Sequence, residues 1–378
     1  MTNPPSTVPA LRIRSGELLA SRLFDIAYAV DLTRASELWS ARAGRGARRS
    51  RLATAAPKAL AFDVPPLQLD LGSAVVDVEG RPATAHISAR LYDFGVVAFA
   101  ARVVVTDIDW TEFAERFNAL DRAIGARAAG GFWIDLLQQV RQAVLPALDR
   151  PATEMLEEDY LIGIVQTLSE PMSAEQLRER ADIAALLAGE SRPLSDAARR
   201  DLMQRSYSYY SDDLVVLGWD RAFVYEPRGD SDVADIIEVA NAQLVEFRYY
   251  DELLDAELPR MYDRVEDARR TISLLASRRV AHLAHKLYAL VAEVTELTEK
   301  IDNALQVTED IYLARVYSGA LELFRVSRIS AAVDRKLAII RDTYAALYDE
   351  ASSRRAEILE IAIVILIAVE IALAVSRH

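Results

Sequence analysis

Four carboxylates lie close together on one predicted helix and are the first candidates for chemistry. Asp251, Glu252, Asp255 and Glu257 follow two adjacent tyrosines. Carboxylate-rich helices can hold metal ions, and converging carboxylates can transfer protons. The Glu-x-x-His pattern of di-iron bundles is missing here. We therefore interpret the cluster as a solvated acidic face, and we expect no metal. The alternative is a catalytic site in which Asp251 and Glu252 take part.

Histidines and tyrosines give two weaker candidates. His282 and His285 are three residues apart on one predicted helix face and could bind a metal if further ligands were present. We interpret them as ordinary surface histidines. Tyr207, Tyr209 and Tyr210 could stack on nucleic-acid bases, but core or rim aromatics are the favoured interpretation.

A short basic stretch is the best candidate for binding phosphate. Residues 41–51 (ARAGRGARRSR) contain five arginines, two glycines and no acid. Such a loop could contact the phosphates of RNA or of anionic lipid headgroups. The alternative is a solvated loop. The candidate contact residues are Arg42, Arg45, Arg48, Arg49 and Arg51.

Composition excludes several classes of protein. The chain has 378 residues, a net charge of −13 and no cysteine. Disulfides, iron–sulfur clusters, thiolate zinc sites and cysteine nucleophiles are therefore excluded. The acidic balance argues against a nucleic-acid coat, and no DNA partner is expected. The sequence lacks G-x-S-x-G, G-x-x-x-x-G-K-[ST], G-x-G-x-x-G and H-E-x-x-H. We predict no catalytic residue and no cofactor.

The C-terminal run is the strongest signal in the chain. Residues 358–375 (ILEIAIVILIAVEIALAV) would form a helix of about 27 Å, close to the roughly 30 Å of a bilayer core. Arg354 and Arg355 precede the run and favour a cytoplasmic position for the rest of the chain. This predicts a single-pass tail anchor in a bacterial inner membrane. A buried core helix is the alternative.

Two acids and two small residues inside the run suggest an additional role. Glu360 and Glu370 are its only charged residues. Ala368 and Ala372 form a small-xxx-small pair, which permits close approach of two helices. We predict that these four residues tune self-association of the anchors.

The elements needed to position these residues form two halves. Residues 21–32, 84–105 and 160–168 predict strands, and 109–124 predicts an amphipathic helix; the order of elements resembles a ferredoxin-like α+β layer. Ser173 and Gln176 form a capping box, and 212–227 predicts a strand or hairpin.

Few helix breakers occur in the second half. Pro259 is the last proline, and we predict helices over 232–256, 260–305 and from 308 onward. Apolar residues spaced three and four apart form one stripe on the last predicted helix. This stripe packs either within a local helical bundle or in a coiled coil between subunits. Its members are Val326, Ile329, Val333, Leu337, Ile340, Tyr344 and Leu347.

These patterns predict an α+β fold followed by long helices and a transmembrane helix. The predicted divisions are a flexible basic N-terminus (1–19), an α+β region (20–228, with 20–125 ferredoxin-like and 155–228 a second part), a long helical or coiled-coil domain (229–356) and an anchor (357–378).

The C-terminal run resembles the closing signature of the "required for meiotic nuclear division" family. Leu359–Glu360 and Glu370–Ile371 match that signature in place, whereas Ile361 stands where the family usually has tryptophan. Residues 94–97 (FGVV) are similar to an aromatic-Gly-Val-Val strand of the same family. The resemblance implies a membrane-anchored, non-catalytic homo-oligomer that tethers ribosomes or other partners.

The predicted function is therefore a non-catalytic, homo-oligomeric scaffold at the cytoplasmic face of the membrane. Its expected partners are further copies of itself, the membrane through residues 358–375, and RNA, ribosomes or anionic lipid through the basic loop. The alternative is a membrane-bound enzyme with a carboxylate site between the α+β and helical regions.

Overall fold

The computed structural model divides the chain into two compact units. Unit 1 comprises Met1–Glu246 and Ile301–Ser327, and unit 2 comprises Phe247–Lys300 and Arg328–His378. The structure describes all residues except 1–10, 44–46, 50–60, 63, 127, 129, 154, 191, 230–231, 271–281, 293, 297–304, 307–310 and 377–378.

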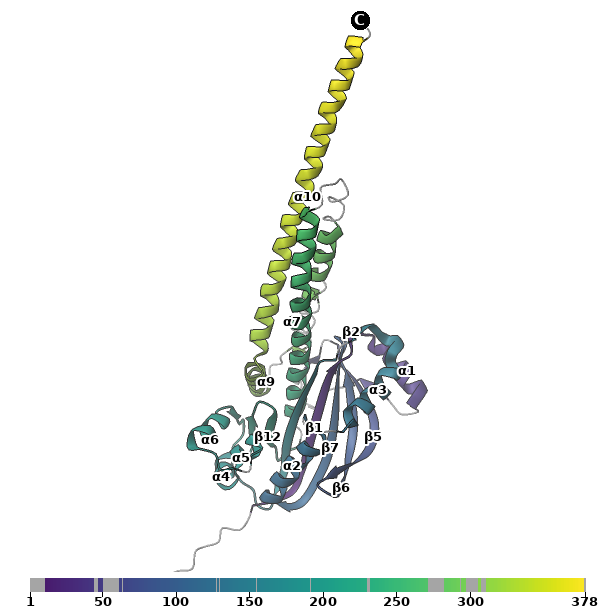
Figure 1. The fold of residues 1–378 in the computed structure, drawn as a ribbon. Coiled ribbons are helices and arrows are strands. Elements are labelled where there is room, and N and C mark those ends of the chain that lie inside the picture. The colour runs from purple at the N-terminus through teal and green to yellow at the C-terminus, as the bar shows by residue number, and fades with distance from the viewer. Residues whose placement is uncertain are drawn as a thin grey trace, which may run out of the picture. The chain divides into compact units, whose positions relative to one another are not determined.

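Unit 1 is built on a large mixed sheet (Figure 1). Within the described residues the sheet has nine strands in the order β10-β11-β12-β9-β1-β7-β6-β5-β3. All neighbours pair antiparallel except β12 and β9, which are parallel. The strands are β1 (Arg12–Asp25), β3 (Ala47–Arg49), β5 (Leu67–Val78), β6 (Arg81–Leu91), β7 (Val96–Asp109), β9 (Glu157–Leu168), β10 (Ser206–Tyr207), β11 (Leu214–Leu217) and β12 (Arg221–Tyr225).

The central strand β1 begins earlier than the sequence predicted. It starts at Arg12, within the stretch expected to be a flexible N-terminus, and pairs along most of its length with both β7 and β9. Strands β5, β6 and β7 form an antiparallel meander. The turn between β5 and β6 has two residues, Glu79 and Gly80, both with positive φ, as the tightest hairpins require.

The first two helices do not cover the sheet together, so the fold is not ferredoxin-like. Helix α2 (Trp110–Ile124) packs on β1, β5 and β7, and Asp109 caps it by accepting a hydrogen bond from Glu112 N. Helix α1 (Leu32–Ala43) contacts α3 (Phe132–Val144), and its main contact with the sheet is at the edge strand β3. The short η1 (Leu145–Ala147) follows α3. Two small ladders lie outside the main sheet: β2 (Ala27–Val30) with β8 (Leu148–Pro151), and β4 (Ala61–Phe62) with β13 (Leu305–Gln306).

Short helices and a hairpin extend the sheet after β9. The capping box of Ser173 and Gln176 is confirmed at the start of α4 (Ala174–Arg180). A second short helix, α5 (Ile183–Ala188), follows with its own cap at Asp182. Helix α6 (Asp196–Leu202) follows. The predicted hairpin is confirmed as β11 and β12, which joins the main sheet through β9.

Helix α7 (Val233–Arg270) passes through Pro259, where the sequence predicted a break. A proline inside a helix costs about 3 kcal/mol. Leu254 and Met261 are buried on either side of it, and their burial offsets that cost. The first part of α7 belongs to unit 1, and its second part to unit 2.

The helices of unit 2 bury the predicted apolar stripe. Helix α10 (Val326–Ser376) follows α9 (Ile311–Leu323), which belongs to unit 1, and residues 282–292 form a further helix of unit 2. Val333, Ile340 and Leu347 of α10 are fully buried within the single chain. The stripe therefore packs in a local helical bundle, which was one of the two arrangements predicted.

Candidate self-association segment

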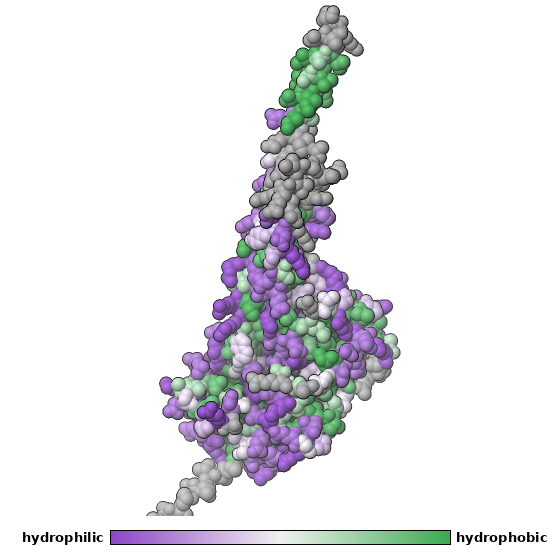
Figure 2. All heavy atoms as spheres, in the orientation of Figure 1, coloured by the Kyte–Doolittle hydropathy of each residue, from purple (hydrophilic) through white to green (hydrophobic). Residues whose placement is uncertain are grey.

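The far end of α10 is an apolar helix exposed to solvent on all sides. We call residues 360–373, whose side chains the structure describes, the apolar segment. Its nine larger aliphatic side chains are each between 50% and 69% exposed. On the face seen in Figure 2, this end of the helix has a hydrophobic surface. The nine side chains are Ile361, Ile363, Val364, Ile365, Leu366, Ile367, Val369, Ile371 and Leu373.

The size of this surface sets it apart from ordinary exposed side chains. Fourteen helical residues are about 21 Å long and at least 10 Å across, which gives a lateral surface of about 650 Å². Glu360 and Glu370 are two of the fourteen residues, so the apolar part is about 560 Å², at the upper end of the roughly 300–600 Å² of the largest apolar patch on a typical monomer. Single exposed aliphatics need no explanation, but a contiguous surface of this size indicates an interaction site.

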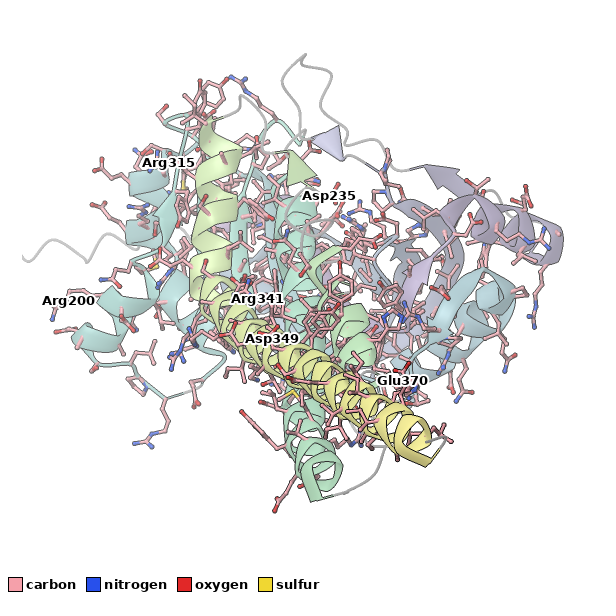
Figure 3. The ribbon with its side chains drawn as sticks, turned by 90° about the horizontal axis from the view of Figure 1, so that it is seen from above. Arg200, Asp235, Arg315, Arg341, Asp349 and Glu370 are labelled. Atoms are coloured by element: carbon pink, nitrogen blue, oxygen red, sulfur yellow. The ribbon has the colours of Figure 1, made fainter. Side chains whose placement is uncertain are left out.

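Helical geometry separates the acids of the segment from its small residues. At about 100° per residue, Ala368 and Ala372 each lie about 160° around the helix axis from Glu370, in opposite directions. Both alanines are therefore on the side of the helix opposite Glu370. Glu360 lies about 80° from Glu370. All four side chains are exposed, and Figure 3 labels Glu370 near the end of α10.

A seam of residues lies opposite Glu370. Ile361, Ile365, Ala368 and Ala372 follow one another at steps of four, three and four, the spacing of a heptad seam. A shallow groove lined by Glu360, Ile361, Val364 and Ile365 lies along the same part of the helix. Sequence reasoning identified the two alanines but missed the isoleucines that continue their line, although the spacing was readable.

The predicted transmembrane anchor requires correction. Among the residues that the structure describes, no helix is both long and apolar enough to cross a membrane. The predictions of a tail anchor and of an inner-membrane location are therefore wrong.

The basic stretch 41–51 is not a single loop. Arg42 is exposed in the last turn of α1, whereas Arg48 and Arg49 belong to the edge strand β3. Arg45 and Arg51 lie outside the described residues, as do the side chains of Arg48 and Arg49. Phosphate binding by this stretch stays a prediction. The side chains of Arg354 and Arg355, in α10, are also outside the described set.

The acidic cluster is joined to α10 by a lysine. Lys336 Nζ lies 2.7 Å from Asp251 Oδ1 and 2.6 Å from Asp255 Oδ1, and it also donates to the backbone carbonyl of Asp251. Burial opposes the charged form of Lys336, but the hydrogen bonds to both aspartates outweigh it and raise the lysine pKa. Glu257 pairs with Arg260 at 2.8 Å. These contacts tie α7 to α10 within unit 2.

The histidine and tyrosine candidates are dispersed. His282 and His285 are both exposed, and the described residues contain no group of three or more potential metal ligands. Tyr209 and Tyr210 are exposed, and the guanidinium of Arg228 lies 4.1 Å from the Tyr210 ring centroid. Tyr207 is half-buried against α9, where a Cβ on Gly319 would overlap its hydroxyl.

A buried polar network that sequence reasoning missed fixes the start of α7 on the sheet. Arg90 of β6 pairs with Asp235 at 2.7 Å and with Glu238 at 3.2 Å, and the Tyr92 hydroxyl donates to Glu238 at 2.8 Å. Burial, followed by the Glu238 charge, raises the pKa of Tyr92; burial also raises that of Glu238. Arg90 and Tyr92 are two residues apart, on one face of the predicted strand, and this was the available signal.

The network borders a cleft on one face of the sheet. The cleft has a volume of about 240 Å³, and Glu17, Arg102, Gln166 and Asp235 are among its lining residues. Four of its charged groups form ion pairs: Arg102 lies 3.5 Å from Glu17, and Asp235 lies 2.7 Å from Arg90. The cleft therefore contributes to the position of α7, and we assign it no ligand.

Comparison with known proteins points to one family. The sequence model described as uncharacterized protein MJ0711, N-terminal domain, matches residues 15–232, which is more than half of the chain. The uncharacterized protein MJ0711 of Methanocaldococcus jannaschii is 23% identical over 244 residues, covering 64% of this chain and 74% of that relative. No solved structure matches.

The match corrects the resemblance inferred from the C-terminal run. The "required for meiotic nuclear division" family finds no support, and its prediction is wrong. The residues that suggested it were two acid-containing dipeptides in an aliphatic run and a four-residue strand motif. Aliphatic helices of unrelated proteins share such short patterns, because few residue types satisfy an apolar surface.

Proposed function

We propose that this chain, which belongs to the family of the N-terminal domain of uncharacterized protein MJ0711, is a non-catalytic homo-oligomeric scaffold. Its copies associate through the apolar segment of α10, and each copy presents the sheet of unit 1. The observation that supports this proposal is the exposure of nine aliphatic side chains around one helix. Association removes part of this apolar surface from water, which stabilises the oligomer by about 25 cal/mol per Å² buried.

The arrangement of the acidic cluster also favours a scaffold. The catalytic alternative needs carboxylates that are available to a substrate, and Asp251 is instead bonded to Lys336. Asp255 shares the same ammonium. A carboxylate engaged in this way stabilises a helix pair, and proton transfer by it would require the ion pair to open.

Any partner other than a further copy of the chain is expected to bind the basic residues near α1 and β3. Binding of RNA, ribosomes or anionic lipid through five arginines is a prediction that charge reversal of all five would test: Arg42, Arg45, Arg48, Arg49 and Arg51. Loss of binding only in that variant would identify the partner surface.

Sedimentation equilibrium of the full chain tests the proposal. We expect wild type to be oligomeric at micromolar concentration. A variant with Ile361→Gln, Ile365→Gln, Leu366→Gln and Val369→Gln should be monomeric, because glutamine is compatible with a helix but replaces four of the nine larger aliphatic side chains of the segment. The matched control replaces exposed aliphatics elsewhere, Val75→Gln and Val104→Gln, which are 69% and 64% exposed.

Two results would overturn the proposal. The first is a monomeric wild type, including one that is recovered only with phosphatidylcholine vesicles. The second is a control variant that dissociates as completely as the segment variant. Circular dichroism of each variant shows whether the helices are retained.

A further inference from the structure

We infer that the apolar segment assembles as a parallel bundle of three or more copies, with Ile361, Ile365, Ala368 and Ala372 facing the bundle axis and Glu370 facing outward. This inference rests on the proposed self-association and specifies its geometry. The occupant of the seam is the same seam on further copies of this chain.

The available area argues against a simple dimer. Two helices in contact cover about half of each circumference, or about 650 Å² in total for segments of this length. Stable interfaces bury about 1,200–2,000 Å². A pair of segments therefore falls well short, whereas a third or fourth helix adds further contacts for every member of the bundle.

The residue pattern determines which face turns inward. The seam contains the two alanines, which permit close approach of the helix backbones, together with two isoleucines at heptad spacing. Both charged residues of the segment are off the seam, since Glu370 lies opposite and Glu360 about 80° away from Glu370. A carboxylate at the axis would lose its hydration without a partner, so the side with Glu370 stays in contact with water.

Symmetry then sets the relative direction of the helices. Identical copies that each use one seam close into a ring through a rotation axis. Copies related by a rotation axis that runs along the bundle point in the same direction. The helices are therefore parallel, and equivalent residues of neighbouring copies lie at the same height.

The absence of cysteine from the sequence makes this geometry directly testable. Each single-cysteine variant of the full chain carries one thiol, and oxidation by copper–phenanthroline in air links only positions that approach closely, with Cα atoms within about 7 Å. We expect Ala368→Cys to form disulfide-linked dimers on a denaturing gel. Glu370→Cys, only two residues away, should remain monomeric on that gel and serves as the matched control.

Two further variants test whether the helices of the bundle are parallel or antiparallel. Ile361→Cys and Ala372→Cys are separated by about 16 Å along the helix. In a parallel bundle each variant links to itself, and a mixture of the two gives no linked species that contains both. An antiparallel arrangement would give the mixed species alone and would overturn the inference.

The outcomes separate this inference from the proposed function. If sedimentation shows an oligomer but Glu370→Cys links and Ala368→Cys does not, the seam is wrong and the scaffold stands. A dimer as the largest species would overturn the stoichiometry alone. A monomer in sedimentation, with no linkage in any variant, would overturn both.

Discussion

Lys336 Nζ lies 2.7 Å from Asp251 Oδ1, across 85 residues of sequence. The contact joins α10 to α7, and only 17% of the lysine side chain is exposed. Asp251 is the residue that a catalytic interpretation of the acidic cluster would place first. Because Asp251 pairs with Lys336, the carboxylate joins two helices. The role of an acidic residue on a helix therefore depends on the side chains that pack against it.

Removal of this lysine should destabilise unit 2. Lys336→Met leaves Asp251 partly buried without its cation, and we expect a loss of about 1–3 kcal/mol in the free energy of unfolding by urea. Arg341→Met is the control, because its contact with Asp342 is long and exposed at both ends; its expected effect is within about 0.5 kcal/mol. Similar losses in the two variants would contradict the assigned role.

The same pair predicts a dependence on alkaline pH. The pKa of Lys336 is raised on folding, so the stability from this contact is fully present below the usual lysine pKa and is lost as pH rises through the raised value. The difference in unfolding free energy between wild type and Lys336→Met should therefore be constant between pH 6 and pH 9. A difference that shrinks over that range would disagree with the raised pKa.

Arg90 is expected to be the most sensitive charged residue of unit 1. Arg90→Met would leave Asp235 and Glu238 as buried carboxylates without a counter-ion, at a cost of about 3–5 kcal/mol. Arg14→Met is the matched control, since Arg14 also pairs with an aspartate but is 55% exposed. Equal unfolding midpoints for the two variants would refute this role.

Asp25 should make folding sensitive to pH near neutrality. Burial raises its pKa from 3.8 to about 7, although Ala27 N–H and Arg141 oppose the shift. Oδ2 of Asp25 has no hydrogen-bond partner among the described residues. The contribution of this group is fully present below pH 3.8 and is lost as pH rises through about 7.

The measurement compares wild type with Asp25→Asn by chemical denaturation at several pH values. Wild type should lose stability relative to the variant between pH 4 and pH 7, because the carboxyl group ionises in the unfolded state while burial keeps it protonated in the native state. Two curves that run parallel through that interval would show that Asp25 does not titrate in this range.

Two glycines with positive φ should respond differently to alanine. Gly95 has φ 98°, and a Cβ there would overlap the backbone carbonyl of Ala27. Gly80 has φ 78° with no atom within 4 Å of a Cβ. Gly80→Ala should cost about 1–2 kcal/mol from backbone strain alone, and Gly95→Ala should cost a further 1–3 kcal/mol or so from overpacking. Thermal unfolding that ranks them equally would contradict this distinction.

The sequence by itself determined those elements whose pattern is local. The helix predicted over 109–124 is α2, and the capping box of Ser173 begins α4, since caps and amphipathic spacing act within a few residues. The stripe of α10 from Val333 to Leu347 is buried as its spacing of three and four indicated. The exposed apolar segment was also evident, although its interpretation as an anchor was wrong.

Tertiary structure decided the rest, because the energies involved join distant parts of the chain. Strand β1 lies between β7 and β9, a pairing that no local pattern encodes. Helix α7 continues through Pro259 because burial on both sides outweighs a local penalty. Arg90 and Lys336 pair with residues 145 and 85 positions away in the sequence. Packing removes water from these charges, so that loss of either partner would be costly to stability.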